Sequence, residues 1–290
     1  MLLHRPRRSG KFMVSILGFI AVGTLTLTAC SPAVNPGPVP SPSPSSSRAT
    51  TAAPKAKTPA SPTTPATSAT PTTPAAKPLT GKVIVVDPGH GKGRQLSNPI
   101  SNGRGGRKIC NTSGTATNAG YPEYKFTWHV ADYLRNKLQE QGATVVLTRD
   151  NGPNAEICVD RRGKLANEKG AAALISIHGN GSESSAPHGF FVMVSSPPLN
   201  AAQGQPSKQL ARAVSGGLKG AGLTPSTTFG SNPVPRSDLA TLNFAQVPAV
   251  MVELGEMRNP QDARRMSSPE GQQQYASGLA QGILSYFSAG

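Results

Sequence analysis

Hydrophobic residues along the second part of the chain follow two patterns. Short runs rich in β-branched residues alternate with longer stretches in which apolar residues recur every three or four positions. The short runs predict buried strands, and the longer stretches predict amphipathic helices. We predict strands over residues 82–86, 143–148, 173–177, 189–194 and 248–254, with a further short strand over 239–243. We predict helices over residues 124–141, 160–169, 208–218 and 272–287.

The alternation of strands and helices indicates the fold class. It favours an α/β domain built on a mostly parallel sheet with helices on both faces. Residues 81–290 are long enough to form one such domain with a sizeable core. Ligands of parallel sheets bind beyond the carboxyl ends of the strands, so candidate site residues are sought there.

The first 80 residues have a different composition. They contain 14 of the 28 prolines and none of the 14 Asp and Glu residues. A basic segment, residues 1–11, precedes a mostly apolar segment, residues 12–27, and the sequence then reads Thr-Ala-Cys. This order resembles the signal of a bacterial lipoprotein, which implies removal of residues 1–29 and a lipid on Cys30. The alternatives are an ordinary secretory signal and an uncleaved anchor. The lipoprotein reading places the domain at the outer face of the cytoplasmic membrane, and each alternative also places it outside the cytoplasm.

Residues 30–80 are predicted to be a disordered tether. Thirteen prolines among residues 31–80 oppose a packed core and favour extended polyproline II segments. A flexible chain of this length spans roughly 40 Å, and a fully extended one spans roughly 150 Å. The expected organisation is therefore a signal peptide (1–29), a lipidated cysteine with a tether (30–80) and one globular domain (81–290).

The net charge of +15 is shared between the N-terminal part and the domain. Residues 81–290 carry 21 Lys and Arg against 14 Asp and Glu, so the domain is moderately basic and attracts anionic partners. Aromatic residues are few and no nucleic-acid motif is present, so we expect no nucleic-acid partner. Four cations that we expect to flank a binding groove lie in the Gly- and Asn-rich segment 91–120: Arg94, Arg104, Arg107 and Lys108.

Polar residues stand at the ends of three predicted strands. His90 follows the first strand, His178 follows the third, and Glu253 lies near the end of the last. Neighbouring parallel strands would bring these side chains to one edge of the sheet. Glu123, one residue before the first predicted helix, lies at the same edge if that helix leads into the next strand. Two imidazoles and one carboxylate form the ligand set of a catalytic zinc, and a second carboxylate serves as a general base. Spacing alone does not decide which carboxylate is the ligand and which is the base.

Five sequence blocks resemble, in order, those of the zinc-dependent N-acetylmuramoyl-L-alanine amidases of the amidase-3 family. They are VIVVDPGHGKG (83–93), PEYKFTWHVADYLRNKL (122–138), TVVLTRD (144–150), RGKLANEKGAAALISIHGN (162–180) and VPAVMVELGEMRNPQDARRM (247–266). The segment NGRGGRKICNTSGTATNAGYPE (102–123) is similar to the mycobacterial and actinobacterial branch. The resemblance extends over nearly all of residues 82–287.

The resemblance implies a mixed, mostly parallel sheet of six strands flanked by helices. It also implies one zinc ion held by His90, Glu123 and His178, with Glu253 as the catalytic base. The implied reaction is hydrolysis of the amide between the lactyl group of N-acetylmuramic acid and the L-alanine of the peptidoglycan stem peptide. The chain departs from the family at Glu256, which replaces a common aromatic residue, so we expect a different substrate rim beside the base.

The expected partners are peptidoglycan and, through Cys30, the membrane, and we expect a monomer. One alternative function keeps the zinc but cleaves within the stem peptide, as a peptidoglycan endopeptidase. Another is an inactive wall-binding lipoprotein. The DPGH and VELG sequences oppose the first alternative, and the four intact site residues oppose the second. The other histidines of the domain, His129 and His188, are expected to lie outside the zinc site.

Two cysteines remain in the domain, Cys110 and Cys158. In an exported domain two such thiols indicate one disulfide, and two free thiols are the alternative. The bond would join the segment 91–120 to the loop before the second helix. Closing a loop of this size stabilises a fold by about 4 kcal/mol in the chain-entropy model.

Overall fold

The computed structural model describes residues 76–92, 96–150, 152 and 155–289. The predicted signal peptide, Cys30, residues 30–75 of the tether and the cation Arg94 lie outside the described residues. Among the described residues, no helix combines the length and the hydrophobicity needed to cross a bilayer.

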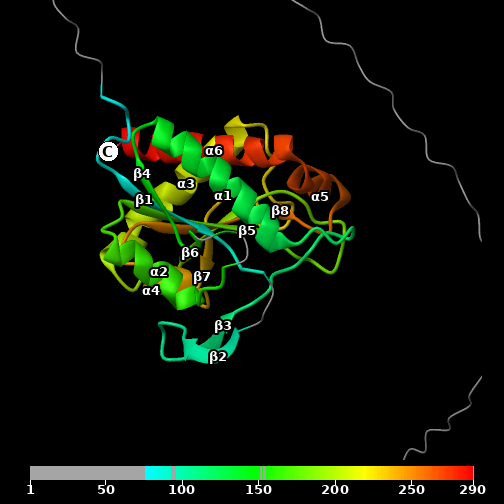
Figure 1. Ribbon diagram of the computed structural model, residues 1–290, viewed down its shortest axis with the longest axis horizontal. Coiled ribbons are helices and arrows are strands. Elements are labelled where there is room, and N and C mark those ends of the chain that lie inside the picture. The colour runs from blue at the N-terminus through cyan, green and yellow to red at the C-terminus, as the bar shows by residue number, and fades with distance from the viewer. Residues whose placement is uncertain (1–75, 93–95, 151, 153–154, 290) are drawn as a thin grey trace, which may run out of the picture. The chain divides into compact units, whose positions relative to one another are not determined.

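A sheet of six strands forms the centre of the domain (Figure 1). Its strands are β1 (Val83–Pro88), β4 (Thr144–Leu147), β5 (Ala173–Asn180), β6 (Phe191–Ser195), β7 (Val234–Arg236) and β8 (Ala249–Glu256). They lie in the order β4–β1–β5–β8–β6–β7. The strands β4, β1, β5 and β8 are parallel, whereas β6 is antiparallel to β8 and β7 is parallel to β6. The predicted mixed, mostly parallel sheet is confirmed.

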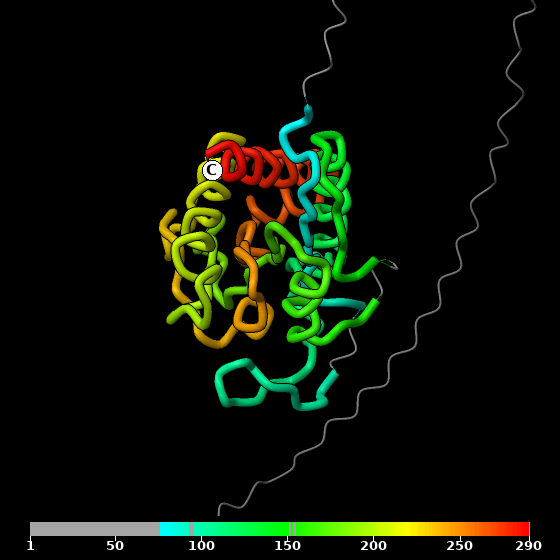
Figure 2. Tube along the Cα trace, turned by 90° about the vertical axis from the view of Figure 1, so that its left-hand side faces the viewer, coloured from blue at the N-terminus to red at the C-terminus, as the bar shows by residue number. Residues whose placement is uncertain are grey.

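Helices cover both faces of the sheet. They are α1 (Glu123–Glu140), α2 (Val159–Glu168), α3 (Gln205–Gly220), α4 (Ala240–Phe244), α5 (Pro260–Ser267) and α6 (Pro269–Ser288), with a short 3-10 turn η1 (Ala201–Gln203). The helices α1, α3 and α6 lie on one face and α2 and α4 on the other (Figures 1 and 2). In β1, Ile84 and Val86 belong to the core beneath the first group, while Val85 belongs to the core beneath the second. Both faces of a strand must therefore be apolar, which explains the unbroken hydrophobic runs.

The helices α3 and α6 approach each other through glycine residues. A Cβ atom on Gly217 would lie 2.3 Å from the carbonyl oxygen of Gly278, so a side chain at this position would force the helices apart. On the adjoining face α6 presents Tyr275, Leu279 and Ile283 to the core, and all three are fully buried. Their four-residue spacing is the pattern that predicts the C-terminal helix.

The predicted strand over residues 239–243 is wrong, because these residues belong mostly to the short helix α4. The side-chain amide of Gln203 donates to the carbonyl oxygens of Leu242, Asn243 and Ala245. These bonds satisfy carbonyl groups that the end of a helix leaves without partners. Five residues of which three are apolar do not distinguish a short helix from a strand, and here a distant side chain supports the helix. The strand β7 and the helix α5 have no counterpart among the predicted elements.

The segment 91–120 contains a hairpin that the hydrophobic pattern did not predict. Its strands, β2 (Leu96–Ser101) and β3 (Arg107–Asn111), are antiparallel. In the turn between them, Arg104 donates to Ser195 Oγ at 2.8 Å and to Asn243 Oδ1 at 3.1 Å. This cation therefore holds the hairpin against the domain.

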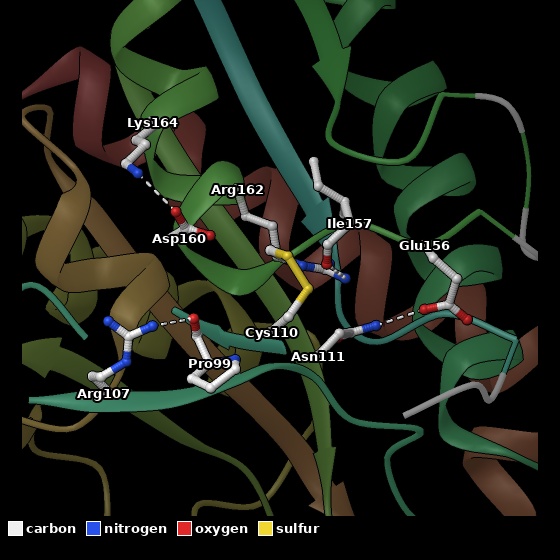
Figure 3. The surroundings of a disulfide bond; sticks show 10 residues. Pro99, Arg107, Cys110, Asn111, Glu156, Ile157, Asp160, Arg162 and Lys164 are labelled. Carbon is white, nitrogen blue, oxygen red and sulfur yellow. Dashed lines mark hydrogen bonds and ion pairs between the residues drawn. A yellow bond between two sulfur atoms is a disulfide. The ribbon is translucent and has the colours of Figure 1, made fainter. Parts of the chain in front are cut away.

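A disulfide joins Cys110 in β3 to Cys158, the residue before α2, as the sequence predicted (Figure 3). Beside it, Asn111 Nδ2 donates to Glu156 Oε2 at 2.7 Å. The covalent bond and the hydrogen bond together fasten the hairpin to the beginning of α2.

Candidate metal centre

Three side chains that are far apart in the sequence meet at the carboxyl ends of β1 and β5. His90 follows β1, Glu123 is the first residue of α1, and His178 lies in β5. The Nε2 atom of His90 lies 3.1 Å from Glu123 Oε1 and 3.1 Å from His178 Nδ1. The third side of this triangle, from His178 Nδ1 to Glu123 Oε1, measures 3.2 Å.

The size of the triangle fits a metal ion. Zinc binds nitrogen and oxygen ligands at about 2.0–2.1 Å in tetrahedral geometry, which places neighbouring ligand atoms roughly 3.3 Å apart. The three atoms of His90, Glu123 and His178 lie 3.1–3.2 Å apart, close to this tetrahedral spacing. Each atom belongs to a residue type that binds zinc. A set of three protein ligands leaves one coordination position open for chemistry.

Backbone groups orient two of these side chains. The carbonyl oxygen of Thr112 lies 2.9 Å from His90 Nδ1, so the ring donates there and turns the lone pair of Nε2 toward the cluster. The Glu123 carboxylate accepts one backbone N–H on each oxygen, from Gly179 on Oε1 at 3.0 Å and from Thr115 on Oε2 at 2.9 Å. These bonds hold the carboxylate with Oε1 facing both imidazoles.

Gly89 allows the ring of His178 to lie against β1. A Cβ atom at this position would be 2.4 Å from His178 Cε1 and 2.6 Å from both ring nitrogens. Glycine is therefore required beside the ligand for a steric reason, and the DPGH sequence has a physical meaning at this residue.

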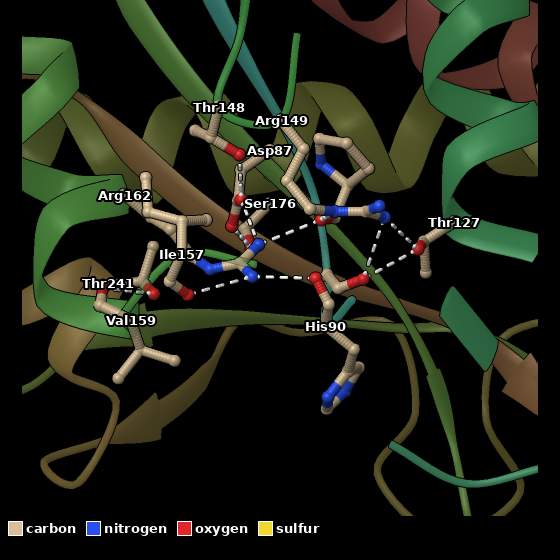
Figure 4. A network of polar contacts seen from close by, with 12 residues as sticks. Asp87, His90, Thr127, Thr148, Arg149, Ile157, Val159, Arg162, Ser176 and Thr241 are labelled. Atoms are coloured by element: carbon tan, nitrogen blue, oxygen red, sulfur yellow. Dashed lines mark hydrogen bonds and ion pairs between the residues drawn. The ribbon is translucent and has the colours of Figure 1, made fainter. Parts of the chain in front are cut away.

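Two buried arginines hold the backbone that carries His90 (Figure 4). Among the described residues, His90 is the one non-glycine residue with a positive φ, at 60°, a conformation that persists only where its surroundings impose it. Arg162 donates to the carbonyl oxygens of Pro88 and His90, each at 2.8 Å, and to Asp87 Oδ1 at 2.7 Å. Arg149 Nε donates to the Pro88 carbonyl at 2.9 Å. This network fixes the backbone position of His90 on the side away from the metal cluster.

Asp87 keeps its charge inside the core. Burial alone would raise the pKa of its carboxyl, but the Arg162 charge and the hydroxyls of Ser176 and Thr148 hold the pKa below its usual value. The Asp87–Arg162 pair is almost completely buried. Such a pair is costly to break because either partner alone would be an uncompensated charge.

The ionisable groups of the cluster influence one another. Burial alone would raise the pKa of the Glu123 carboxyl, but the imidazoles of His90 and His178 hold that pKa well below its usual value. Burial alone would lower the pKa of His90, yet the Glu123 carboxylate raises it. For His178 the effect of burial prevails and lowers the pKa. An anionic carboxylate between imidazoles is the charge state that a divalent cation requires.

Glu253 lies next to the cluster on the neighbouring strand β8. It is the register partner of His178, and it lines a cavity of about 210 Å³ together with both imidazoles. Its Oε2 atom is buried and has no hydrogen-bond partner among the described residues. Burial, and then the negative charges of Glu123 and Glu256, raises the pKa of Glu253 well above its usual value. A buried carboxyl of high pKa at a reactive site has the properties of an acid–base group.

Glu256, which stands where the family commonly has an aromatic residue, does not form part of an exposed rim. Its side chain is buried and accepts a hydrogen bond from Asn180 Nδ2 at 2.7 Å. Its effect on the site is electrostatic, through the pKa of Glu253. His129 is exposed on α1 and His188 lies in a loop, and neither belongs to the metal-ligating group.

The predicted cations do not line the cavity at the cluster. Within the described part of segment 91–120, Arg104, Arg107 and Lys108 bond to groups of the hairpin and of the adjacent domain surface. The residue of β3 that does reach the cavity is the neutral Asn111. The expectation that these cations flank the groove is not met by the three that the structure describes.

Comparisons with known proteins define the family. Residues 84–285 match the family model described as N-acetylmuramoyl-L-alanine amidase. The chain belongs to this amidase family. It is 42% identical over 211 residues to the N-acetylmuramoyl-L-alanine amidase Rv3717 of Mycobacterium tuberculosis, across 72% of this chain and 87% of that protein.

Two solved amidase structures share its fold. Ami1 of Mycobacterium smegmatis aligns with a TM-score of 0.71 and 41% identity, over 73% of this chain and 99% of that one. The apo form of Ami1 from Mycobacterium abscessus aligns with a TM-score of 0.69 and 43% identity, over 72% of this chain and 99% of that one. The family, the enzyme class and the fold that the sequence blocks predicted are thereby confirmed.

The charged residues behind the cluster of this amidase were not apparent from its sequence. Asp87, Arg149 and Arg162 were not singled out, because charged residues are usually placed at the surface. The available indication was the position of Asp87, which directly follows an apolar run that the sheet buries on both sides.

Proposed function

We propose that this amidase hydrolyses the bond between the lactyl group of N-acetylmuramic acid and the L-alanine of the stem peptide, with Zn²⁺ on His90, Glu123 and His178. The observation that carries this proposal is the triangle of ligand atoms, 3.1–3.2 Å on each side, next to the buried carboxyl of Glu253. When bound, zinc supplies a Lewis acid that polarises the scissile carbonyl and makes water a better nucleophile.

Glu253 acts first as a general base and then as a general acid. Its carboxylate takes a proton from the water that attacks the carbonyl carbon, and it returns this proton to the leaving amine of L-alanine. The hydroxyl group of the water ends on the lactyl carbonyl carbon, and the C–N bond breaks. The products are a lactyl carboxylic acid on the glycan and a stem peptide with a free amine. The raised pKa of Glu253 favours both proton transfers, because the group can hold a proton between them.

We also propose that residues 1–29 are a signal peptide and that a lipid on Cys30 attaches the chain to the outer face of the cytoplasmic membrane. The order of a basic segment, an apolar segment and Thr-Ala-Cys supports the signal, and the prolines of residues 31–80 support a tether. Peptidoglycan lies outside that membrane, so the substrate and the predicted location agree.

Analysis of the reaction products tests the proposed activity. The full-length chain is purified in detergent, loaded with Zn²⁺ and incubated with peptidoglycan, and the released fragments are identified by mass spectrometry. We expect stem peptides that begin with a free L-alanine amine, together with glycan that carries free lactyl acids. Fragments cut within the peptide would indicate an endopeptidase instead, and binding without release would indicate an inactive wall-binding protein. A chelator should abolish the release, and added zinc should restore it.

A further inference from the structure

A groove of about 420 Å³ lies at the beginning of α1, beside the metal cluster. Its wall includes Gly114, Thr115 and Arg258. Thr115 donates its backbone N–H to Glu123, and a Cβ atom on Gly114 would lie 2.6 Å from Glu123 Oε2. One wall of the groove is therefore formed by residues that lie directly against the carboxylate of a metal-ligating residue.

Arg258 continues this groove into a second hollow of about 380 Å³, which is also lined by Asn118 and by Arg264 of α5. The Arg258 side chain is exposed but oriented. Its Nη1 donates to Asn118 Oδ1 at 3.1 Å, and Asn118 Nδ2 in turn contacts the Arg258 carbonyl oxygen at 3.4 Å. A guanidinium carries five N–H donors, so a single bond to a neutral amide leaves most of its capacity for a ligand.

The two hollows are lined by positively charged side chains and by no negatively charged one among the described residues. No Asp or Glu is among the described residues that line either hollow. Within the described part of the chain, neither Arg258 nor Arg264 takes part in an ion pair, whereas the neighbouring Arg265 contacts Asp262. An arginine that lies in a groove and faces no carboxylate among the described residues is suited to bind a carboxylate of a ligand, often through two parallel N–H···O bonds.

We propose that Arg258, assisted by Arg264, binds a carboxylate of the stem peptide, so that the enzyme prefers a peptide with free acids over one whose acids are carboxamides. This inference rests on the proposed function, because the cleaved amide must lie at the metal cluster for the peptide to enter the groove. The sugar rings beside that amide are uncharged, whereas the peptide carries carboxylates. The basic groove therefore matches the peptide side of the substrate.

Two synthetic N-acetylmuramoyl tripeptides test the proposal, one with its peptide acids as carboxylates and the other with the same acids as primary carboxamides. The kcat/KM of the full-length, zinc-loaded chain is measured for both substrates. We expect the wild type to prefer the carboxylate form. Arg258→Gln should reduce that preference by roughly tenfold or more, mainly through KM, because a charge-assisted hydrogen bond is lost from binding. Arg258→Lys should retain part of the preference, because it keeps the charge but not the planar fork.

Arg212→Gln provides the matched control. Arg212 lies in a different hollow with Lys82, beyond the opposite end of β1, and its replacement should leave the preference and the zinc content unchanged. An unaltered preference in Arg258→Gln, an equal loss for both substrates, or the same loss in Arg212→Gln would overturn the proposal.

Calorimetric titration with the free tripeptides separates this proposal from the proposed function. If the wild type cleaves neither substrate, the amidase assignment fails, and the carboxylate site is then judged by binding alone. Tighter binding of the acidic tripeptide that depends on Arg258 supports the site, and equal binding by wild type and Arg258→Gln overturns it.

Discussion

Glu253 and His178 are direct register partners on the neighbouring parallel strands β8 and β5. Register partners point to the same face of a sheet, so one continuous hydrogen-bonded framework carries both the candidate base and a candidate ligand. Their separation is therefore set by strand pairing and not by a loop. Positions on a rigid sheet hold reacting groups more accurately than positions on loops do.

Replacing Glu253 with alanine should lower kcat by roughly 10²–10⁴-fold, which is the usual contribution of a general acid–base group. Zinc should stay bound, because Glu253 supplies none of the three clustered ligand atoms. Stem-peptide release and the zinc content of the purified chain measure the two effects. Glu183→Ala removes an exposed carboxylate and serves as the control, with both quantities unchanged. Near-normal turnover in Glu253→Ala would contradict its assignment as the base.

The acidic limb of the pH–activity profile should report the ionisation of Glu253. Burial, and then the negative charges of Glu123 and Glu256, raises its pKa, and the base works only when deprotonated. The kcat/KM should therefore fall as the pH falls through this raised pKa. Glu256→Gln removes one of the negative charges, while the amide oxygen can still accept the bond from Asn180. The pKa of Glu253 should then decrease, and the acidic limb should move to lower pH. A limb that stays in place or moves to higher pH would show that another group is titrating.

Replacing Gly89 with alanine should weaken zinc binding by roughly 10–100-fold, the range for changes that displace a ligand from outside the first shell. The added Cβ would lie 2.4 Å from the ring of His178, so the ring must move. Competition with a chromophoric chelator measures the affinity without relying on turnover. Gly216→Ala in α3 is the control, because nothing lies within 4 Å of the added atom there. Equal zinc affinity in both variants would argue against His178 as a ligand.

Replacing Arg162 with methionine should reduce the free energy of unfolding by about 3–5 kcal/mol, since it leaves Asp87 buried without its partner. Urea unfolding measures the change. Arg161→Met removes the adjacent, exposed arginine, whose pair with Glu168 at 3.1 Å is half exposed, and it should cost about 1 kcal/mol at most. Similar losses in the two variants would contradict a structural role for the buried pair.

The Asp87–Arg162 pair should make the free energy of unfolding depend on pH in a defined direction. The pKa of Asp87 is lower in the folded chain than its usual value of 3.8. The ionised carboxylate therefore makes its full contribution to the free energy of unfolding above that usual pKa. The contribution is lost as the pH falls through the still lower folded-state pKa. The difference in stability between wild type and Arg162→Met should therefore be largest near neutral pH and shrink below about pH 4. A difference that grows in acid would have the wrong sign.

The sequence by itself determined the layers of the domain. Residues 82–86 and 124–141 were predicted as strand and helix, and β1 and α1 occupy nearly these positions. The reason is local, because a strand buried on both faces and a helix buried on one face impose different spacings on apolar residues. The order of the sequence blocks also predicted the family, and the two remaining cysteines of an exported domain predicted the pairing of Cys110 with Cys158.

The sequence left the roles of the two carboxylates open until the family resemblance was considered, and only the tertiary structure placed them. Glu123 Oε1 lies between the imidazoles, whereas Glu253 lies one strand away with a buried oxygen. Their assignment as ligand and base remains a prediction that the variants above test.

Other features were decided by tertiary contacts alone. The helix α4 depends on Gln203, and the backbone of His90 depends on Arg162, which lies 72 positions away in the chain. Glu256, which the sequence marks only as a departure from the family pattern, is buried against Asn180. Hydrophobic periodicity records whether a residue is buried and with what repeat, but it does not record which distant residue will be its partner. That choice is made only when the elements pack against one another.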